Sequence, residues 1–185
     1  MKKFGLLFII MILTYISSAQ DDMRQLPRSQ TTNKICYTDI ITLDTTFKRN
    51  LLFSNASEWF AKTYKSSKDV IQLSDREGGK IVGKAAMKVY HKALGTDNFS
   101  GYVNYTISIY VKEGKFKYEI TDFTHSGAPA GSYGNAEGWY TRDGKMWRKY
   151  FDYYLQQIDQ NTKSLIGELK QSMMKRDVGS NNDAW

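Results

Sequence analysis

The chain has 185 residues with 26 Lys or Arg and 19 Asp or Glu, which gives a formal net charge of +7. This length suits a single domain that buries a sizeable core without disulfides or metal ions. Basic residues are scattered among acidic ones, as in Lys68-Asp69 and Arg142-Asp143, so the charges predict a solvated surface, and we expect no nucleic-acid partner.

The first 19 residues have the order of a secretory signal peptide. Lys2 and Lys3 precede an apolar run over residues 4–16, and small residues follow up to Ala19. The run has about 13 residues, fewer than the ~20 of a membrane-spanning helix, although an uncleaved anchor is the alternative. We expect cleavage after Ala19 and a periplasmic or secreted mature protein without an integral membrane span.

The mature chain is expected to hold one α+β domain between two polar ends. Residues 20–34 predict a flexible lead-in, residues 35–178 the domain, and residues 179–185 a flexible tail. The domain opens with a strand over residues 35–45. Cys36 is the only cysteine, so no intrachain disulfide forms, and its place in this strand favours a small semi-buried side chain over a nucleophile.

A helix follows the first strand. Apolar residues recur at spacings of three and four, which is typical of an amphipathic helix: Leu52, Ala56, Trp59 and Phe60. Asn50 is the expected N-cap, because its side chain can accept a hydrogen bond from a free N–H of the first turn. Ser66-Ser67 is the expected end of this segment.

Residues 78–85, GGKIVGKA, differ by one position from the phosphate-binding loop G-x-x-x-x-G-K-[ST], because Ala85 replaces the hydroxyl residue. A phosphate loop joins a strand to a helix, whereas the residues after Lys84 are typical of a strand. The stretch therefore predicts the outgoing strand of a β-hairpin with its turn at residues 75–79. Gly83 marks either a bulge or a close approach of the helix backbone.

The clearest strand pattern lies between residues 102 and 123. Apolar and polar residues alternate on both sides of Glu113-Gly114, which predicts an antiparallel hairpin with a two-residue loop. That loop sets the core pairs: Val111 with Phe116, Ile109 with Tyr118, and Ile107 with Ile120.

The last predicted element is a helix of nearly thirty residues that starts near Trp147. Its apolar residues step by three and four as far as Met173, so one face needs a broad surface to cover. The predicted order is β-α-β-β-β-β-α, an antiparallel sheet with a long C-terminal helix packed across it.

Three stretches carry a resemblance to a known family: the helix with Trp59, the segment SSKDVIQLSDREGGKIVGKA, and the strands YTISIYVKEGKFKYEITDF. Together, over roughly residues 37–125, they resemble a bacterial envelope family of unknown function, domain of unknown function 4468. The resemblance implies a TBP-like fold, similar to helix-grip proteins that hold apolar ligands between helix and sheet. It also implies a signal peptide, and it assigns no catalytic residue.

The residues give little sign of chemistry. His91 and His125 lie on different segments without the spacing of metal ligands, and no G-x-S-x-G nucleophile motif occurs. We therefore expect no enzyme activity, no metal and no cofactor. A Gly-rich loop over residues 124–145 brings aromatic residues to the start of the last helix, namely Tyr133, Trp139, Tyr140 and Trp147.

Two functions remain open. The first is a non-enzymatic protein-interaction module that binds an envelope protein through an exposed sheet face, where Tyr102 and Tyr110 are accessible. The second is a carrier or sensor of a small apolar ligand held between the C-terminal helix and the sheet, with the four loop aromatics as its lid. Those aromatics are equally compatible with a plug at the end of the core.

Overall fold

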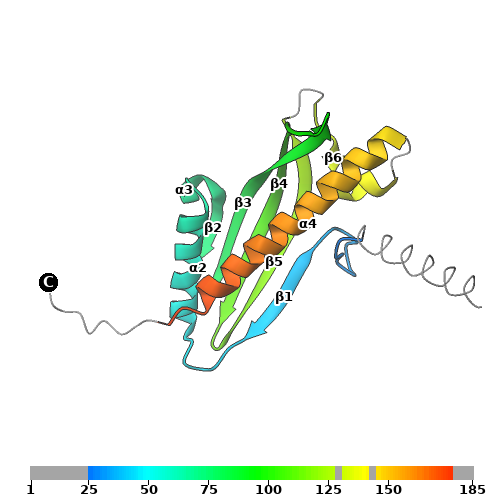
Figure 1. Cartoon of the computed structure of the whole chain (residues 1–185). Helices are drawn as coiled ribbons and strands as arrows, with labels where there is room; N and C mark the ends of the chain where they lie inside the picture. The colour runs from blue at the N-terminus through cyan, green and yellow to red at the C-terminus, as the bar shows by residue number, and fades with distance from the viewer. Residues whose placement is uncertain (1–24, 128–130, 142–144, 177–185) are drawn as a thin grey trace, which may run out of the picture.

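The computed structural model describes residues 25–127, 131–141 and 145–176, without the side chains of the first helical turn at 145–148. The predicted signal peptide and tail lie outside these residues. No helix in the described part is long and apolar enough to cross a membrane. A long helix runs diagonally across a twisted antiparallel sheet (Figure 1).

The order of elements confirms the predicted α+β fold and adds three short elements. The strands are β1 (Tyr37–Thr42), β2 (Ile71–Asp75), β3 (Lys80–Ala93), β4 (Thr96–Lys112), β5 (Lys115–Ser126) and β6 (Gly134–Asn135). The helices are α2 (Arg49–Thr63), α3 (Ser67–Val70), the 3-10 helix η1 (Ala136–Thr141) and α4 (Lys145–Met173). The antiparallel sheet has the strand order β1-β5-β4-β3-β2, and β6 pairs with β5.

The predicted hairpins are both present. In β4–β5 the core pairs are those expected, including Val111 with Phe116 and Ile107 with Ile120. Gly114 in the connecting loop has φ +66°, a conformation that glycine adopts without strain. The GGKIVGKA stretch joins the β2–β3 turn to β3, so the phosphate-loop interpretation is excluded by the strand that follows it in place of a helix.

The start of α2 differs from the expectation. The helix begins at Arg49 with Lys48 as its N-cap, and Lys48 makes no side-chain cap hydrogen bond. The predicted N-cap, Asn50, lies inside the first turn, so that prediction was wrong. The buried Phe47 (5% exposed) anchors the chain immediately before the helix, and this long-range packing sets the start in place of the local capping preference.

The core lies on one face of the sheet, beneath α2 and α4. Inward side chains alternate along the central strands, among them Ile81, Val103, Tyr105, Ile107, Ile109, Phe116, Tyr118 and Ile120. The other face, which we call the open face, carries the intervening residues. Within the described residues no helix covers the open face (Figure 1).

Helix α4 has the predicted length and the predicted apolar stripe. Its buried residues include Phe151, Tyr154, Leu155, Ile158, Thr162, Leu169 and Met173. The end of α4 is fixed by α2, because the buried Asn55 Nδ2 donates to the backbone oxygens of Met173 (3.2 Å) and Lys175 (2.8 Å). These oxygens lie at the helix end, where carbonyls lack intrahelical partners.

The β3–β4 hairpin extends past the rest of the sheet to a two-residue turn at Leu94-Gly95. Both residues have positive φ, 51° and 81°. Such a turn favours Asn-Gly, because an aliphatic side chain in the left-handed region costs about 1–2 kcal/mol. Leu94 is also fully exposed (105%), so its side chain gains no burial energy at this position.

We expect Leu94→Asn to raise the free energy of unfolding by about 1 kcal/mol, since Asn tolerates the left-handed conformation. Urea denaturation of both proteins measures the change. Leu73→Asn is the control, because Leu73 is another exposed leucine (44%) but lies in strand β2 without a positive φ. Equal or lower stability of the Leu94 variant would contradict the argument.

Candidate functional site

Two of the four predicted lid aromatics pack together at the N-terminal end of α4. Trp139 is 2% exposed and stacks on Phe151 at 5.4 Å between ring centroids. Its Nε1 donates to the Tyr133 carbonyl (3.0 Å), and the Tyr133 ring lies 4.5 Å from the ring of His125. These residues fill the end of the layer between helix and sheet.

The other two lie apart from that cluster or beyond the described side chains. Tyr140 is half-buried; its hydroxyl accepts the Leu26 N–H at 3.3 Å, and the Arg28 guanidinium lies 4.8 Å from its ring. Tyr140 therefore holds the segment before β1, part of the predicted lead-in, in which Leu26 is buried. The side chain of Trp147 is outside the described residues.

Two bulges bring a polar cluster into the same region. In β4 an extra residue near Gly101 (φ 103°) turns the Ser100 side chain toward the helices. In β5 an extra residue at Asp122 (φ 60°) turns the His125 side chain toward the helices. His91 Nδ1 lies 3.3 Å from Ser100 Oγ, which also hydrogen bonds to the Tyr154 hydroxyl. The two histidines, separate in sequence, thus share one serine.

Both ring nitrogens of His125 are used by the backbone. Nε2 donates to the Ser100 carbonyl (2.7 Å), and Nδ1 accepts the Tyr133 N–H (3.4 Å), as the neutral ring requires. Burial lowers the pKa of His125, and the hydrogen bond to Ser100 partly offsets that effect. This arrangement fixes a structural histidine. Among the described residues, no group of three His, Cys, Asp or Glu is placed to hold a metal ion.

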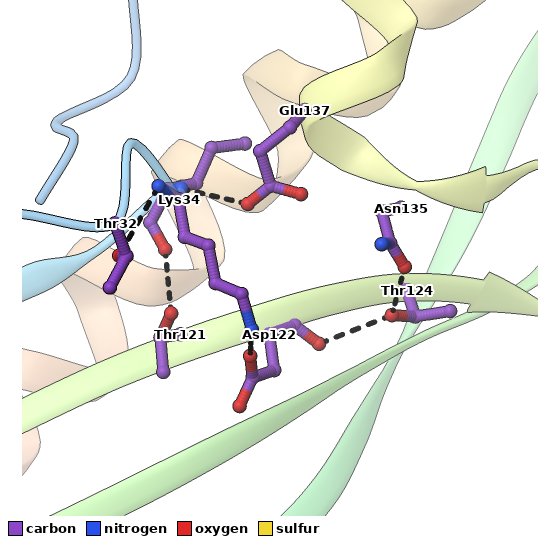
Figure 2. A network of polar contacts seen from close by, with 8 residues as sticks. Thr32, Lys34, Thr121, Asp122, Thr124, Asn135 and Glu137 are labelled. Atoms are coloured by element: carbon purple, nitrogen blue, oxygen red, sulfur yellow. Dashed lines mark hydrogen bonds and ion pairs between the residues drawn. The ribbon is translucent and has the colours of Figure 1, made fainter.

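A second polar network clamps the segment before β1 to β5 and η1 (Figure 2). Lys34 Nζ forms an ion pair with Asp122 at 2.6 Å. Glu137 Oε1 accepts the backbone N–H of Ile35 (2.7 Å), and Thr121 Oγ1 donates to the Ile35 carbonyl (2.9 Å). Because Ile35 is fully buried, both of its backbone groups depend on these partners.

A polar hollow of about 640 Å³ lies beside this clamp, between residues 28–34 and the open face. Its lining includes Lys117, Asp122 and Cys36. Cys36 was predicted to be a semi-buried strand residue; it lies immediately before β1 and is 8% exposed, and burial raises the pKa of its thiol. A protonated, shielded thiol is a poor nucleophile.

The open face has the features of a candidate binding surface. Ile40 is 62% exposed on β1, and Tyr102 is 39% exposed on β4. Tyr110 lies between Lys80 and Lys117, whose Nζ atoms are 5.2 and 5.6 Å from its ring centroid. Tyr102 and Tyr110 are therefore where the strand pattern placed them, on the face opposite the core.

The order of charges along the sequence did not indicate that lysines gather on the open face. The strand pairing places six of them on the open face: Lys80, Lys84 and Lys88 on β3, Lys112 on β4, and Lys115 and Lys117 on β5. Acidic neighbours in sequence made these charges look evenly mixed. Alternation along each strand, combined with the register, was the signal that could have found them.

The comparisons with known proteins agree with this fold. The model of a family described as a domain of unknown function (DUF4468) with TBP-like fold matches residues 37–126. No curated protein matches the chain.

The crystal structures that are similar to the chain include those of two bacterial proteins. One is a DUF4468 family protein from Bacteroides ovatus ATCC 8483, with a TM-score of 0.62, 15% identity, and 83% of this chain and 93% of the other covered. The second is a TBP-like protein from Parabacteroides distasonis ATCC 8503, with a TM-score of 0.56, 14% identity and coverage of 78% and 96%. At such identities the likeness shows the fold alone. Through residues 37–126, which span β1 to β5 and α2, the chain belongs to the DUF4468 family with its TBP-like fold.

Proposed function

We propose that this chain is a non-enzymatic binding module of the bacterial envelope that holds a partner protein on its open face. The observation that carries the proposal is a broad sheet face with no helix over it in the described residues, on which Ile40 and Tyr102 remain exposed. Tyrosines and isolated apolar side chains among polar ones are the usual composition of a protein-protein interface.

The compartment is part of the same proposal. The signal-peptide pattern of residues 1–19 supports export, and a mature chain with Cys36 as its single cysteine is compatible with an oxidising compartment. The partner is then an envelope or extracellular protein, and we propose neither a cofactor nor a nucleic-acid partner.

The contacts of the polar residues support a binding function over catalysis. Both ring nitrogens of His125 hydrogen bond to backbone groups, so neither is available as a general base. Ser100 is 4% exposed beneath Tyr154 and has no access for a substrate carbonyl. A carrier of apolar ligands would hold its cargo between α4 and the sheet, and in that layer Phe151, Phe123 and Ile158 are packed in the core.

Site-specific photo-crosslinking tests the proposal. A benzoylphenylalanine placed at Ile40 or at Tyr102 on the open face, in cells of a bacterium that carries the natural protein, is expected to give one discrete adduct. Mass spectrometry then identifies the protein in that adduct, and the purified pair is tested for direct binding.

The control position is Gln156, an exposed residue of α4 on the opposite side of the molecule. The proposal predicts no adduct of the same mass from Gln156. It is refuted if the open-face positions give no protein adduct, or if all three positions capture the same mixture of proteins.

A further inference from the structure

The open face carries positive charge that its own residues leave unneutralised. Six lysines share the face with the carboxylates of Asp75 and Glu119, and Asp122 at the edge of the face is paired with Lys34. Glu119 forms an ion pair with Lys117 (3.2 Å), and Asp75 Oδ1 accepts the Gly78 N–H (2.8 Å) in the β2–β3 turn. Within the described residues, four of these lysines have neither an ion-pair partner nor an aromatic ring beneath the charge: Lys84, Lys88, Lys112 and Lys115.

Some lysines elsewhere on the molecule are paired with carboxylates. On the side of the helices, Lys62 pairs with Glu58, and Lys163 with Asp159 (2.7 Å). Across the sheet edge, Lys170 of α4 reaches a carboxylate of β1 at 3.2 Å. Lys65, Lys68 and Lys149 are exposed and likewise have no ion-pair partner within the described residues. What distinguishes the open face is the number of lysines gathered on it, because strand alternation places these six side chains on one surface.

This arrangement costs stability in the isolated protein. Lys112 and Lys115 are directly opposite each other across the β4–β5 ladder, and like charges in that position repel. Tyr110 offsets part of the repulsion farther along the face, since its ring lies between Lys80 and Lys117. A surface of this kind gains the most when a partner brings negative charge to it.

We infer that the partner of the open face is a protein that presents an acidic surface, an inference that rests on the proposed function. Carboxylates opposite Lys84, Lys88, Lys112 and Lys115 would neutralise the unpaired charges. Exposed apolar and aromatic side chains also lie on this face, Tyr102 beside Lys88 and Ile40 beside Lys117. They favour a protein over a purely charged polymer, because they supply contacts that another protein surface fills.

Binding of labelled poly-L-glutamate, as a peptide polyanion, tests this charge selectivity by fluorescence anisotropy. We expect binding in about 50 mM NaCl that weakens at least roughly tenfold in about 300 mM NaCl, as screening predicts. The triple variant Lys84→Glu, Lys88→Glu, Lys112→Glu is expected to weaken binding by about tenfold or more at the lower salt. The new carboxylate at position 112 would face Lys115 as an opposite charge, so this substitution should not unfold the protein.

A second triple variant controls for net charge. Lys65→Glu, Lys149→Glu and Lys175→Glu change the charge equally at exposed positions on the helix side. This control is expected to keep at least about a third of the affinity of the natural sequence. Equal loss in both triple variants would refute a localised site, and binding to dextran sulfate or to phosphatidylglycerol vesicles but not to poly-L-glutamate would refute a protein partner.

The two proposals fail separately. A crosslinked partner on the open face whose contact surface is neutral or basic would leave the proposed function standing and overturn the acidic partner. Face-specific binding of poly-L-glutamate without any protein adduct would leave the charge selectivity of the face standing and overturn the partner protein. A partner whose affinity falls about tenfold or more with the open-face triple variant, and not with the helix-side variant, supports both.

Discussion

Gly83→Ala is expected to lower the free energy of unfolding by about 1–3 kcal/mol, the usual cost of extra volume in a packed core. A Cβ on Gly83 would lie 2.6 Å from Phe60 Cε1 and 3.2 Å from Val70 Cγ1. Phe60 is fully buried, so its ring cannot move away without displacing its neighbours. Urea denaturation of the purified variant gives the free energy directly.

Gly167→Ala is the matched control. Gly167 lies in α4 with no atom within 4 Å of an added Cβ, so alanine should raise stability by about 0.5–1 kcal/mol through its better helix propensity. Opposite signs for the two substitutions would show that contact with Phe60 decides the effect. A neutral result at Gly83 would mean that the α2–β3 packing is looser than described.

Glu137→Ala is expected to cost about 1–3 kcal/mol, because it removes the acceptor of a buried backbone N–H. That N–H belongs to Ile35, which is fully buried, and the Glu137 carboxylate reaches it at 2.7 Å. The same substitution should speed amide hydrogen exchange at Ile35, and heteronuclear NMR measures this at the single residue.

Glu137→Gln separates the hydrogen bond from the charge. Glutamine keeps a carbonyl oxygen at the same position and should retain most of the stability and of the exchange protection at Ile35. If alanine and glutamine behave alike, the clamp shown in Figure 2 does not depend on this acceptor.

Strong periodicity made much of the fold predictable from sequence. The β4–β5 register followed from alternation around Glu113-Gly114, and α4 followed from its stripe of residues three and four apart. The outer part of the β3–β4 hairpin was not foreseen. Polar residues of low strand propensity, Asp97 and Asn98, lie near its start and are held in the ladder by pairing with β3.

The sequence predicted either a bulge or a close approach of the helix backbone at Gly83, and the structure shows which group approaches. The ring of Phe60, a side chain of α2, takes the space where a Cβ would be, rather than the helix backbone. The register of β2 against β3 also shifts between Ile71 and Leu73, next to this position. Both effects depend on how a helix seats on the sheet, which local pattern does not specify.

The candidate sites were harder to predict. Aromatic residues in a Gly-rich loop are compatible with a lid or with a plug, and only the contacts of Trp139 with Phe151 place that side chain in the core. The lysine face required register as well as pattern. The clamp at Ile35 joins residues 102 positions apart, and no local signal marks such a pair.

Strand β1 and helix α4, near the two ends of the described chain, complete the core through contacts that are distant in sequence, and this affects when the core forms during folding. Strand β1 pairs with β5, which follows it only after α2 and three further strands, and Asn55 of α2 binds the end of α4. Contacts so distant in sequence form slowly, because the intervening chain must first be ordered. The part of the apolar sheet face that α4 covers is therefore left exposed until α4 has been synthesised as far as Met173.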